Sequence, residues 1–384
     1  MRTLSFLFIA LLGIASSATP ALALDRPPQF VMLAFDNCQE NGTWQEISDF
    51  VDQMNATNKD TLHFTFFLSA VGLLTDKSKM VYVDPIGRAG KSNIDFGGST
   101  RDVLKRIAWL NKMRGDGNEI GSHAVGHFSG KSWTADQWRH EIQQFDNIID
   151  HVVENNGFTG PQAALAKLDF TSKDIVGFRA PYLDGNKELD QVLEESGFEY
   201  DTSDTSEGWD FTTWPRHFSI GPKLMKLWNF GLSFLTLQYT FISESDLALG
   251  HARSKRTGKL PAMDYNFCYD QTGGCPDKDP FAAEADQDAL EMYNAYAKAF
   301  LANYNGNRAP LHIGHHFQHY RGGAYNRALF QFAKMVCGLP EVRCTTYNKL
   351  NDFMTAIGPA GRSQFQKGDF PKAPTISFDW LPAQ

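Results

Sequence analysis

The chain has 384 residues, of which 42% are hydrophobic, 13% aromatic and 21% charged. This composition excludes an intrinsically disordered chain, because the apolar side chains suffice to form a large core. The net charge of −8 provides no overall basic field, which argues against nucleic acid as the main partner. The length is compatible with one large α/β domain or two ordinary ones.

The first 23 residues have the parts of a secretory signal peptide. Arg2 precedes an apolar run over residues 4–14, and Ala21-Leu22-Ala23 fits the small-x-small cleavage pattern. This run is too short to span a bilayer, so we expect no stable membrane insertion. We predict export to the periplasm or the medium, cleavage near Ala23, and a single catalytic domain over residues 24–384.

Export permits disulfide bonds, and the chain has five cysteines. Cys268 lies close in sequence to Cys275, and Cys337 to Cys344. Sequence alone does not fix the pairing. We favour these two local pairs, which leave Cys38 over, with reduced and buried cysteines as the alternative.

Along the chain, apolar runs of strand length alternate with stretches of helical periodicity. Strands are predicted at residues 30–35, 62–68, 118–122, 175–178, 227–237, 311–317 and 343–346. Helices are predicted at residues 44–54, 100–113, 134–153, 187–195, 282–304, 324–336 and 347–357, followed by a tail punctuated by Pro and Gly. Repeated strand–helix units predict parallel strands with helices outside, and this length favours a closed or nearly closed barrel. Residues 200–280 carry few helical signals and are expected to form an insertion of long loops.

Three polar segments each follow a predicted strand, where the active sites of barrels are built. They are Ala34-Phe35-Asp36-Asn37, Ser122-His123-Ala124-Val125-Gly126-His127 and Phe178-Arg179-Ala180-Pro181-Tyr182. On one helical turn, the spacing of His123 and His127 places both imidazoles on one face, as two metal ligands require. Asp36 is a candidate general base, and Arg179 a candidate partner that keeps it ionised. The plainer explanations are surface histidines, a strand-end cap and a rigid turn.

Together the three segments resemble the signature motifs of the polysaccharide deacetylase family (NodB homology, carbohydrate esterase family 4). The motifs of that family read T-F-D-D, H-S/T-x-x-H and R-x-P-Y. This chain has A-F-D-N, H-A-V-G-H and R-A-P-Y in the same order. Residues 177–183, 200–203, 263–275 and 307–310 look especially like the chitin-deacetylase-like branch.

The resemblance implies a distorted (β/α) barrel, usually seven-stranded, with long loop insertions, that removes acetyl groups from an N-acetylated, chitin-like or peptidoglycan-like carbohydrate. It implies Asp36 as the general base, Arg179 as the residue that orients it, and Tyr182 as a backbone contact to the oxyanion. It implies His123 and His127 as ligands of a divalent metal that polarises the amide carbonyl and activates water. Zinc is the expected metal, with cobalt, nickel and manganese as alternatives.

A further imidazole is expected to protonate the leaving amine. The candidates are His315 and His316, and because side chains alternate along a strand, only one of them should face the site. The short family pattern fits His315, whereas the alignment from Asn307-Arg308-Ala309-Pro310 favours His316, which we prefer. Asp201 is a candidate for tuning this histidine.

One position departs from the family pattern. The second acid of the first motif, normally the third metal ligand, is Asn37. A neutral amide is a weaker ligand than a carboxylate, so metal affinity should fall, while a bound metal should acidify its water more strongly. Cys38 is a less favoured replacement ligand, because strand parity argues against both residues facing the site.

Three functions therefore stay open. The first is a metal-dependent deacetylase, the second a catalytically weak or inactive carbohydrate-binding relative, and the third a hydrolase of another C–N bond or of an O-acetyl ester. Tryptophans at these spacings are more often core residues, and Trp209 and Trp214 are the better candidates for exposed positions that stack on sugar rings. The sequence does not indicate the oligomeric state.

Overall fold

The computed structural model describes residues 25–205, 209–237, 259–272, 275 and 284–376. The predicted signal peptide lies outside these residues. Within them, every helix is too short or too polar to cross a bilayer.

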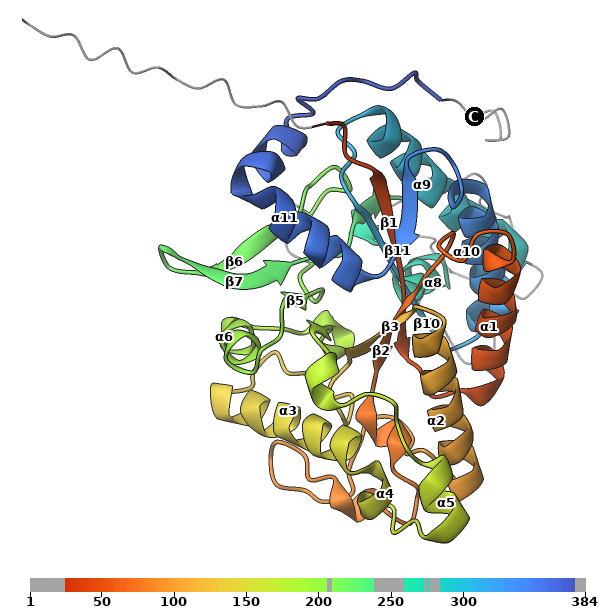
Figure 1. Ribbon diagram of the computed structural model, residues 1–384, viewed down its shortest axis with the longest axis vertical. Helices are drawn as coiled ribbons and strands as arrows, with labels where there is room; N and C mark the ends of the chain where they lie inside the picture. The colour runs from red at the N-terminus through yellow and green to blue at the C-terminus, as the bar shows by residue number, and fades with distance from the viewer. Residues whose placement is uncertain (1–24, 206–208, 238–258, 273–274, 276–283, 377–384) are drawn as a thin grey trace, which may run out of the picture.

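A nine-stranded sheet, mostly parallel, forms the centre of the molecule (Figure 1). Its order is β10-β1-β2-β3-β4-β5-β7-β6, and β11 also pairs with β1. Among the described pairs of this sheet, β6–β7 alone is antiparallel, and β8 and β9 form a separate two-stranded antiparallel sheet. The strands are β1 (Gln29–Asn37), β2 (Thr65–Leu68), β3 (Glu119–Ser122), β4 (Gly177–Phe178), β5 (Tyr200–Asp201), β6 (Arg216–Ile220), β7 (Lys223–Asn229), β8 (Phe234–Thr236), β9 (Lys259–Pro261), β10 (Leu311–His316) and β11 (Val342–Thr345).

Helices flank the sheet, with α1, α2 and α10 along one side and α11 along the other (Figure 1). The predicted α/β class with parallel strands and external helices is thus confirmed, and the described strand pairings form an open path from β10 to β6. The helices are α1 (Asn41–Asn55), α2 (Thr100–Gly115), α3 (Ala135–Asp150), α4 (Val152–Asn155), α5 (Gly160–Leu165), α6 (Lys187–Glu195), α8 (Asp264–Thr272), α9 (Ala285–Asn305), α10 (Ala324–Val336) and α11 (Tyr347–Gln366).

The structure corrects three of the predicted elements. The expected strand over residues 227–237 is divided into β7 and β8, because the chain passes under Trp209 at Gly231, where a Cβ would lie 2.5 Å from the indole. The region expected to be loops contains the β6–β7 hairpin and α8. Helix α11 continues past residue 357 to Gln366. It is kinked at Gly358, which adopts a φ of 61°.

Side chains of β1 alternate between two cores, and this alternation decides which residues face the site. Val31, Leu33 and Phe35 join the larger cluster, which packs against the flanking helices. Phe30, Met32 and Ala34 join a smaller cluster with Tyr200, Phe230 and Tyr347. Because the side-chain period of a strand is two, Asp36 continues the second series and points toward the smaller cluster.

The structure brings each predicted cysteine pair to bonding distance, Cys268 with Cys275 and Cys337 with Cys344. Cys38 is a buried free thiol. The first bridge closes the end of α8 and the second joins the end of α10 to β11.

Candidate active site

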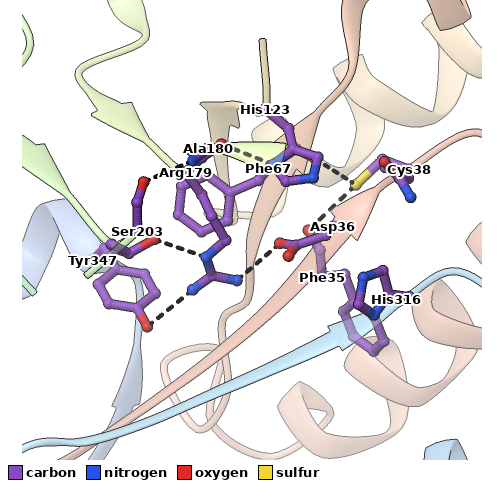
Figure 2. Close-up of polar contacts among 12 residues, drawn as sticks. Phe35, Asp36, Cys38, Phe67, His123, Arg179, Ala180, Ser203, His316 and Tyr347 are labelled. Carbon is purple, nitrogen blue, oxygen red and sulfur yellow. Dashed lines mark hydrogen bonds and ion pairs between the residues drawn. The ribbon is translucent and has the colours of Figure 1, made fainter. Parts of the chain in front are cut away.

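The segments singled out in the sequence meet at the carboxyl ends of four parallel strands (Figure 2). Asp36 and Asn37 end β1, His123 follows β3, Arg179 follows β4, and His316 ends β10. Strand register explains the meeting, since Asp36 lies opposite His316 across the β1–β10 pair. The carboxyl ends of parallel strands collect residues from distant parts of the chain, as this fold class requires.

Asp36 and Arg179 form a fully buried ion pair at the centre of the site. The Arg179 Nη1 donates to Asp36 Oδ1 at 2.8 Å, and its Nε donates to Thr202 Oγ1 at 2.7 Å. Figure 2 shows the guanidinium between Asp36 and Tyr347, and the Phe67 ring centroid lies 4.3 Å from its Cζ. Burial acts to lower the pKa of Arg179, but the charge of Asp36 outweighs it, so the pKa lies above the usual value. The guanidinium therefore stays charged, and its hydrogen bonds hold it against Asp36.

Two buried imidazoles lie next to this pair. The His123 Nδ1 is 2.8 Å from the carbonyl oxygen of Arg179, and the ring centroids of His123 and His127 are 5.1 Å apart. Burial lowers the pKa of His123 to about 4 and that of His127 to about 2, so both rings are neutral at pH 7. Among the residues that the structure describes, the buried Nε2 of His123 and the buried Nδ1 of His127 have no hydrogen-bond partner.

This arrangement suits a metal ligand. When the Nδ1–H of His123 donates to the Arg179 carbonyl, the lone pair is left on Nε2, which is the usual way in which proteins orient a ligating histidine. Two neutral imidazoles with buried, unpartnered nitrogens are donors that zinc and similar divalent metals accept. The residues present thus fit the metal that the motifs imply.

The predicted helical turn between the two histidines is wrong. The segment has no helical backbone, and Ala124 and His127 adopt left-handed φ values of 57° and 54°. A buried carboxylate determines this path instead, because Glu141 Oε1 accepts the N–H groups of Val125 and Gly126 at 2.9 and 3.1 Å.

Helix α3 supplies Glu141, and the carboxylate also ties this loop to a second loop. Its Oε2 accepts a hydrogen bond from Tyr82 Oη at 2.8 Å. A Cβ at Gly126 would lie 2.6 Å from the same hydroxyl, so the glycine permits the close approach. Sequence reasoning missed Glu141 because its contacts lie 15 and more residues away.

The backbone leaves β1 through two consecutive left-handed residues, Asn37 with φ 71° and Cys38 with φ 57°. Asn37 is buried, and its Oδ1 accepts a hydrogen bond from Ser69 Oγ at 3.1 Å. Backbone conformations of this kind are costly for residues other than glycine and collect at functional sites.

The hydrogen bonds of the Cys38 thiol are to backbone carbonyls and not to the histidines. Its Sγ lies 3.5 Å from each of the backbone carbonyls of Phe35 and Phe67, and burial raises the pKa of the thiol. A neutral thiol is a poor ligand, because the thiolate binds metals. Among the described residues, no three His, Cys, Asp or Glu side chains form a metal-binding group.

The two candidate acid histidines face opposite sides of β10. His315 lies opposite Phe35, is fully buried, and is hydrogen-bonded through Nε2 to Tyr296 Oη at 3.1 Å. His316 lies opposite Asp36 and points to the site, as strand alternation requires (Figure 2).

Asp264, at the first position of α8, is the partner of His316 that sequence reasoning missed. Its two oxygens lie 2.7 Å from His316 Nδ1 and 2.9 Å from His316 N. Burial acts to lower the pKa of His316, but the charge and hydrogen bond of Asp264 outweigh it, so the pKa is raised. The only sequence signal for Asp264 was the similarity of residues 263–275 to the chitin-deacetylase-like branch, and this similarity assigned no role to the residue.

The prediction that Asp201 tunes the histidine is not supported by its contacts. Asp201 accepts a hydrogen bond from Ser203 Oγ, which in turn accepts from the backbone N–H of Ala180 at 2.7 Å. Burial raises the pKa of Asp201 to about 8. The Asp201–Ser203 pair thus supports the backbone of the R-A-P-Y segment.

The two tryptophans ranked first for exposure lie in the core, and a tyrosine is exposed instead. Trp209 and Trp214 are buried, and their indole N–H groups donate to Asp204 and to the carbonyl of Asn307. Tyr182 is 57% exposed, has a left-handed φ of 59°, and its ring centroid lies 4.7 Å from that of His127.

The polysaccharide deacetylase family model matches residues 23–200, the part of the chain with Asp36, His123, His127 and Arg179. No curated protein matches the chain. Three solved structures are similar to it over most of its length. The first is a provisionally assigned polysaccharide deacetylase from Mycobacterium smegmatis, with 16% identity over 88% of this chain and 95% of that chain and a TM-score of 0.45. The second is the Xyl-CE4 domain of a multidomain xylanase from the hindgut metagenome of Trinervitermes trinervoides, with 13% identity over 86% of this chain and 93% of that chain and a TM-score of 0.40. The third is BA3943, a CE4 family pseudoenzyme from Bacillus anthracis, with 10% identity over 85% of this chain and 66% of that chain and a TM-score of 0.38. At TM-scores below 0.5, these three similarities bear on neither the fold nor the function.

We expect Glu141→Leu to lower the free energy of unfolding by about 2–4 kcal/mol, because the N–H groups of Val125 and Gly126 stay buried without an acceptor. Urea unfolding measures the loss, and amide hydrogen exchange at these two residues should accelerate. Glu141→Gln is the matched control, since its amide oxygen still accepts both N–H groups. Equal stability of the two variants would contradict the role of Glu141.

We expect Asp264→Asn to lower the pKa of His316 below 6.5, because burial then acts without the opposing carboxylate charge. The stability from this pair is lost as pH rises through the raised pKa of His316, and as pH falls through the lowered pKa of Asp264. NMR titration of the His316 ring measures the shift. Asp201→Asn should leave the titration unchanged, and the opposite pattern in the two variants would refute the assignment.

Proposed function

We propose that this chain is a metal-dependent hydrolase that removes N-acetyl groups from an extracytoplasmic carbohydrate, either chitin-like or peptidoglycan-like. The observation that carries the proposal is the buried Asp36–Arg179 pair lying beside two buried imidazoles, those of His123 and His127, with unpartnered nitrogens. The family-model match over residues 23–200 supports a polysaccharide deacetylase-type domain.

His123 and His127, with the amide of Asn37, would hold the metal. Zinc is the metal we propose first, with cobalt, nickel and manganese as alternatives. When bound, the metal supplies a Lewis acid for the acetyl carbonyl and lowers the pKa of water. Because Asn37 contributes no negative charge, this site binds metal more weakly than one with a carboxylate.

The remaining steps belong to the residues of the chain. Asp36 accepts the proton of the attacking water, and Arg179 holds the carboxylate in place through its hydrogen bond. His316 donates its proton to the leaving amine, and Asp264 holds that proton on the ring. The backbone N–H of Tyr182 contacts the developing oxyanion. His315 takes no part in this scheme, because it faces the opposite side of β10.

Two further proposals concern where the protein acts and which residues form its domain. We propose that residues 1–23 are a cleaved signal peptide and that residues 24–384 form a single exported domain. The two cysteine pairs at bonding distance support an oxidising compartment.

A second candidate function is favoured by Asn37 itself. A site with weakened metal affinity fits a carbohydrate-binding relative with little or no activity. The third candidate, hydrolysis of another C–N bond or of an O-acetyl ester, uses the same residues on a different substrate.

The first experiment is acetate release from N-acetylglucosamine oligomers by the purified protein, with added zinc and with a chelator. We expect release that the chelator abolishes and that Asp36→Asn reduces by about 10²-fold or more, because the base is lost. Binding of the oligomers without release would support the inactive relative. Release from O-acetylated xylan alone would support the third candidate.

We expect Asn37→Asp to strengthen zinc binding by about 10- to 100-fold, because a charged carboxylate replaces a neutral amide. Calorimetric titration of the metal-free protein with zinc measures the change. Asn58→Asp adds the same charge on the exposed loop after α1 and should leave zinc affinity unchanged. A similar gain in both variants would trace the effect to net charge alone.

A further inference from the structure

Exposed aromatic side chains collect at one place in this molecule. Among the large hydrophobic residues that the structure describes as exposed, the aromatic ones are Tyr182 (57%), Tyr265 (40%) and Tyr269 (54%). Tyr182 contacts His127, and Tyr265 contacts His316 with ring centroids 6.2 Å apart. The described exposed tyrosines thus lie at the candidate active site.

The tyrosines of α8 form a continuous surface that leads away from His316. Tyr265 and Tyr269 are four residues apart, so they share one face of the helix, and their ring centroids are 6.2 Å apart. Tyr320 packs against both Tyr265 and His316, with a centroid distance of 5.8 Å in each case. A ligand group at His316 therefore has aromatic rings directly beside it.

The helix that carries these rings is anchored at both ends. Asp264, its first residue, holds His316 through two hydrogen bonds, and Cys268 is bonded to Cys275 beyond its last turn. Between these points, Phe267 is buried, and Gln271 accepts a hydrogen bond from Tyr325 Oη. A surface that is fixed before binding loses little conformational freedom when a ligand arrives.

The chemistry of this surface favours a sugar ring. The face of an aromatic ring packs well against the C–H groups of a pyranose, and the tyrosine hydroxyl accepts or donates to sugar hydroxyls. Exposed aromatic surface next to a polar site is typical of a binding site rather than of ordinary protein surface. The reacting sugar takes the position between Asp36 and His316, so a ring on Tyr269 belongs to a neighbouring unit.

We propose that Tyr265 and Tyr269 form a stacking subsite for a neighbouring pyranose ring, so that the substrate is a chain of two or more sugars. This inference rests on the proposed function and names its substrate class. A substitution at Tyr269 tests the subsite without removing a contact of His316, because Tyr265 lies between Tyr269 and His316.

The test compares a monomer and a tetramer of N-acetylglucosamine by calorimetry, with a chelator present so that no turnover disturbs the measurement. We expect Tyr269→Ala to weaken tetramer binding by about 2- to 10-fold and to leave monomer binding unchanged. Tyr269→Phe should retain most of the affinity. Leu165→Ala removes a similarly exposed apolar side chain on α5 and should change neither constant.

Equal tetramer affinity with and without the Tyr269 ring would overturn the subsite, as would an equal loss for monomer and tetramer or an unsubstituted protein that binds neither sugar. Acetate release by the unsubstituted chain tests the proposed function separately. Loss of tetramer affinity without any acetate release would support the subsite and refute the deacetylase.

Discussion

The site depends on a charge pair that has no access to water. Asp36 and Arg179 are 143 residues apart in sequence, and each needs the other, because an isolated buried charge is strongly unfavourable. Arg179 also positions one of the histidines, since its backbone carbonyl orients His123. The surrounding contacts of Thr202, Ser203 and Tyr347 hold the arginine segment where the carboxylate requires it.

Backbone strain and buried hydrogen bonds are concentrated around this pair. Left-handed residues end β1 and bound the histidine loop, and Glu141 holds that loop in place. Such conformations persist only when neighbouring contacts determine them. The low pKa values of His123 and His127 follow from the same enclosure, which removes water from the imidazoles.

Periodicity and strand-end position were enough to predict the α/β class, most helices and the three polar segments that follow β1, β3 and β4, whereas His316 came from the family resemblance. Alternation along β10 leaves two histidines, and only the register with β1 shows that His316 faces Asp36. Local patterns do not reveal Asp264 or Glu141, because each acts across a long sequence separation. The two tryptophans ranked first for exposure are buried instead: the indole of Trp209 donates to Asp204, a neighbour in sequence, whereas the indole of Trp214 donates to the carbonyl of Asn307, which only the fold brings near.

Helix α8 joins two properties that are separable in principle. Its first residue, Asp264, sets the proton affinity of His316, and the next turn presents Tyr265 and Tyr269 to the surface beside it. The side chains that α8 contributes to the two properties, those of Asp264, Tyr265 and Tyr269, lie on the helix and not on a strand of the main sheet. Replacing this one nine-residue helix by another would therefore alter acidity and ligand preference as a unit, while the Asp36–Arg179 framework stayed the same.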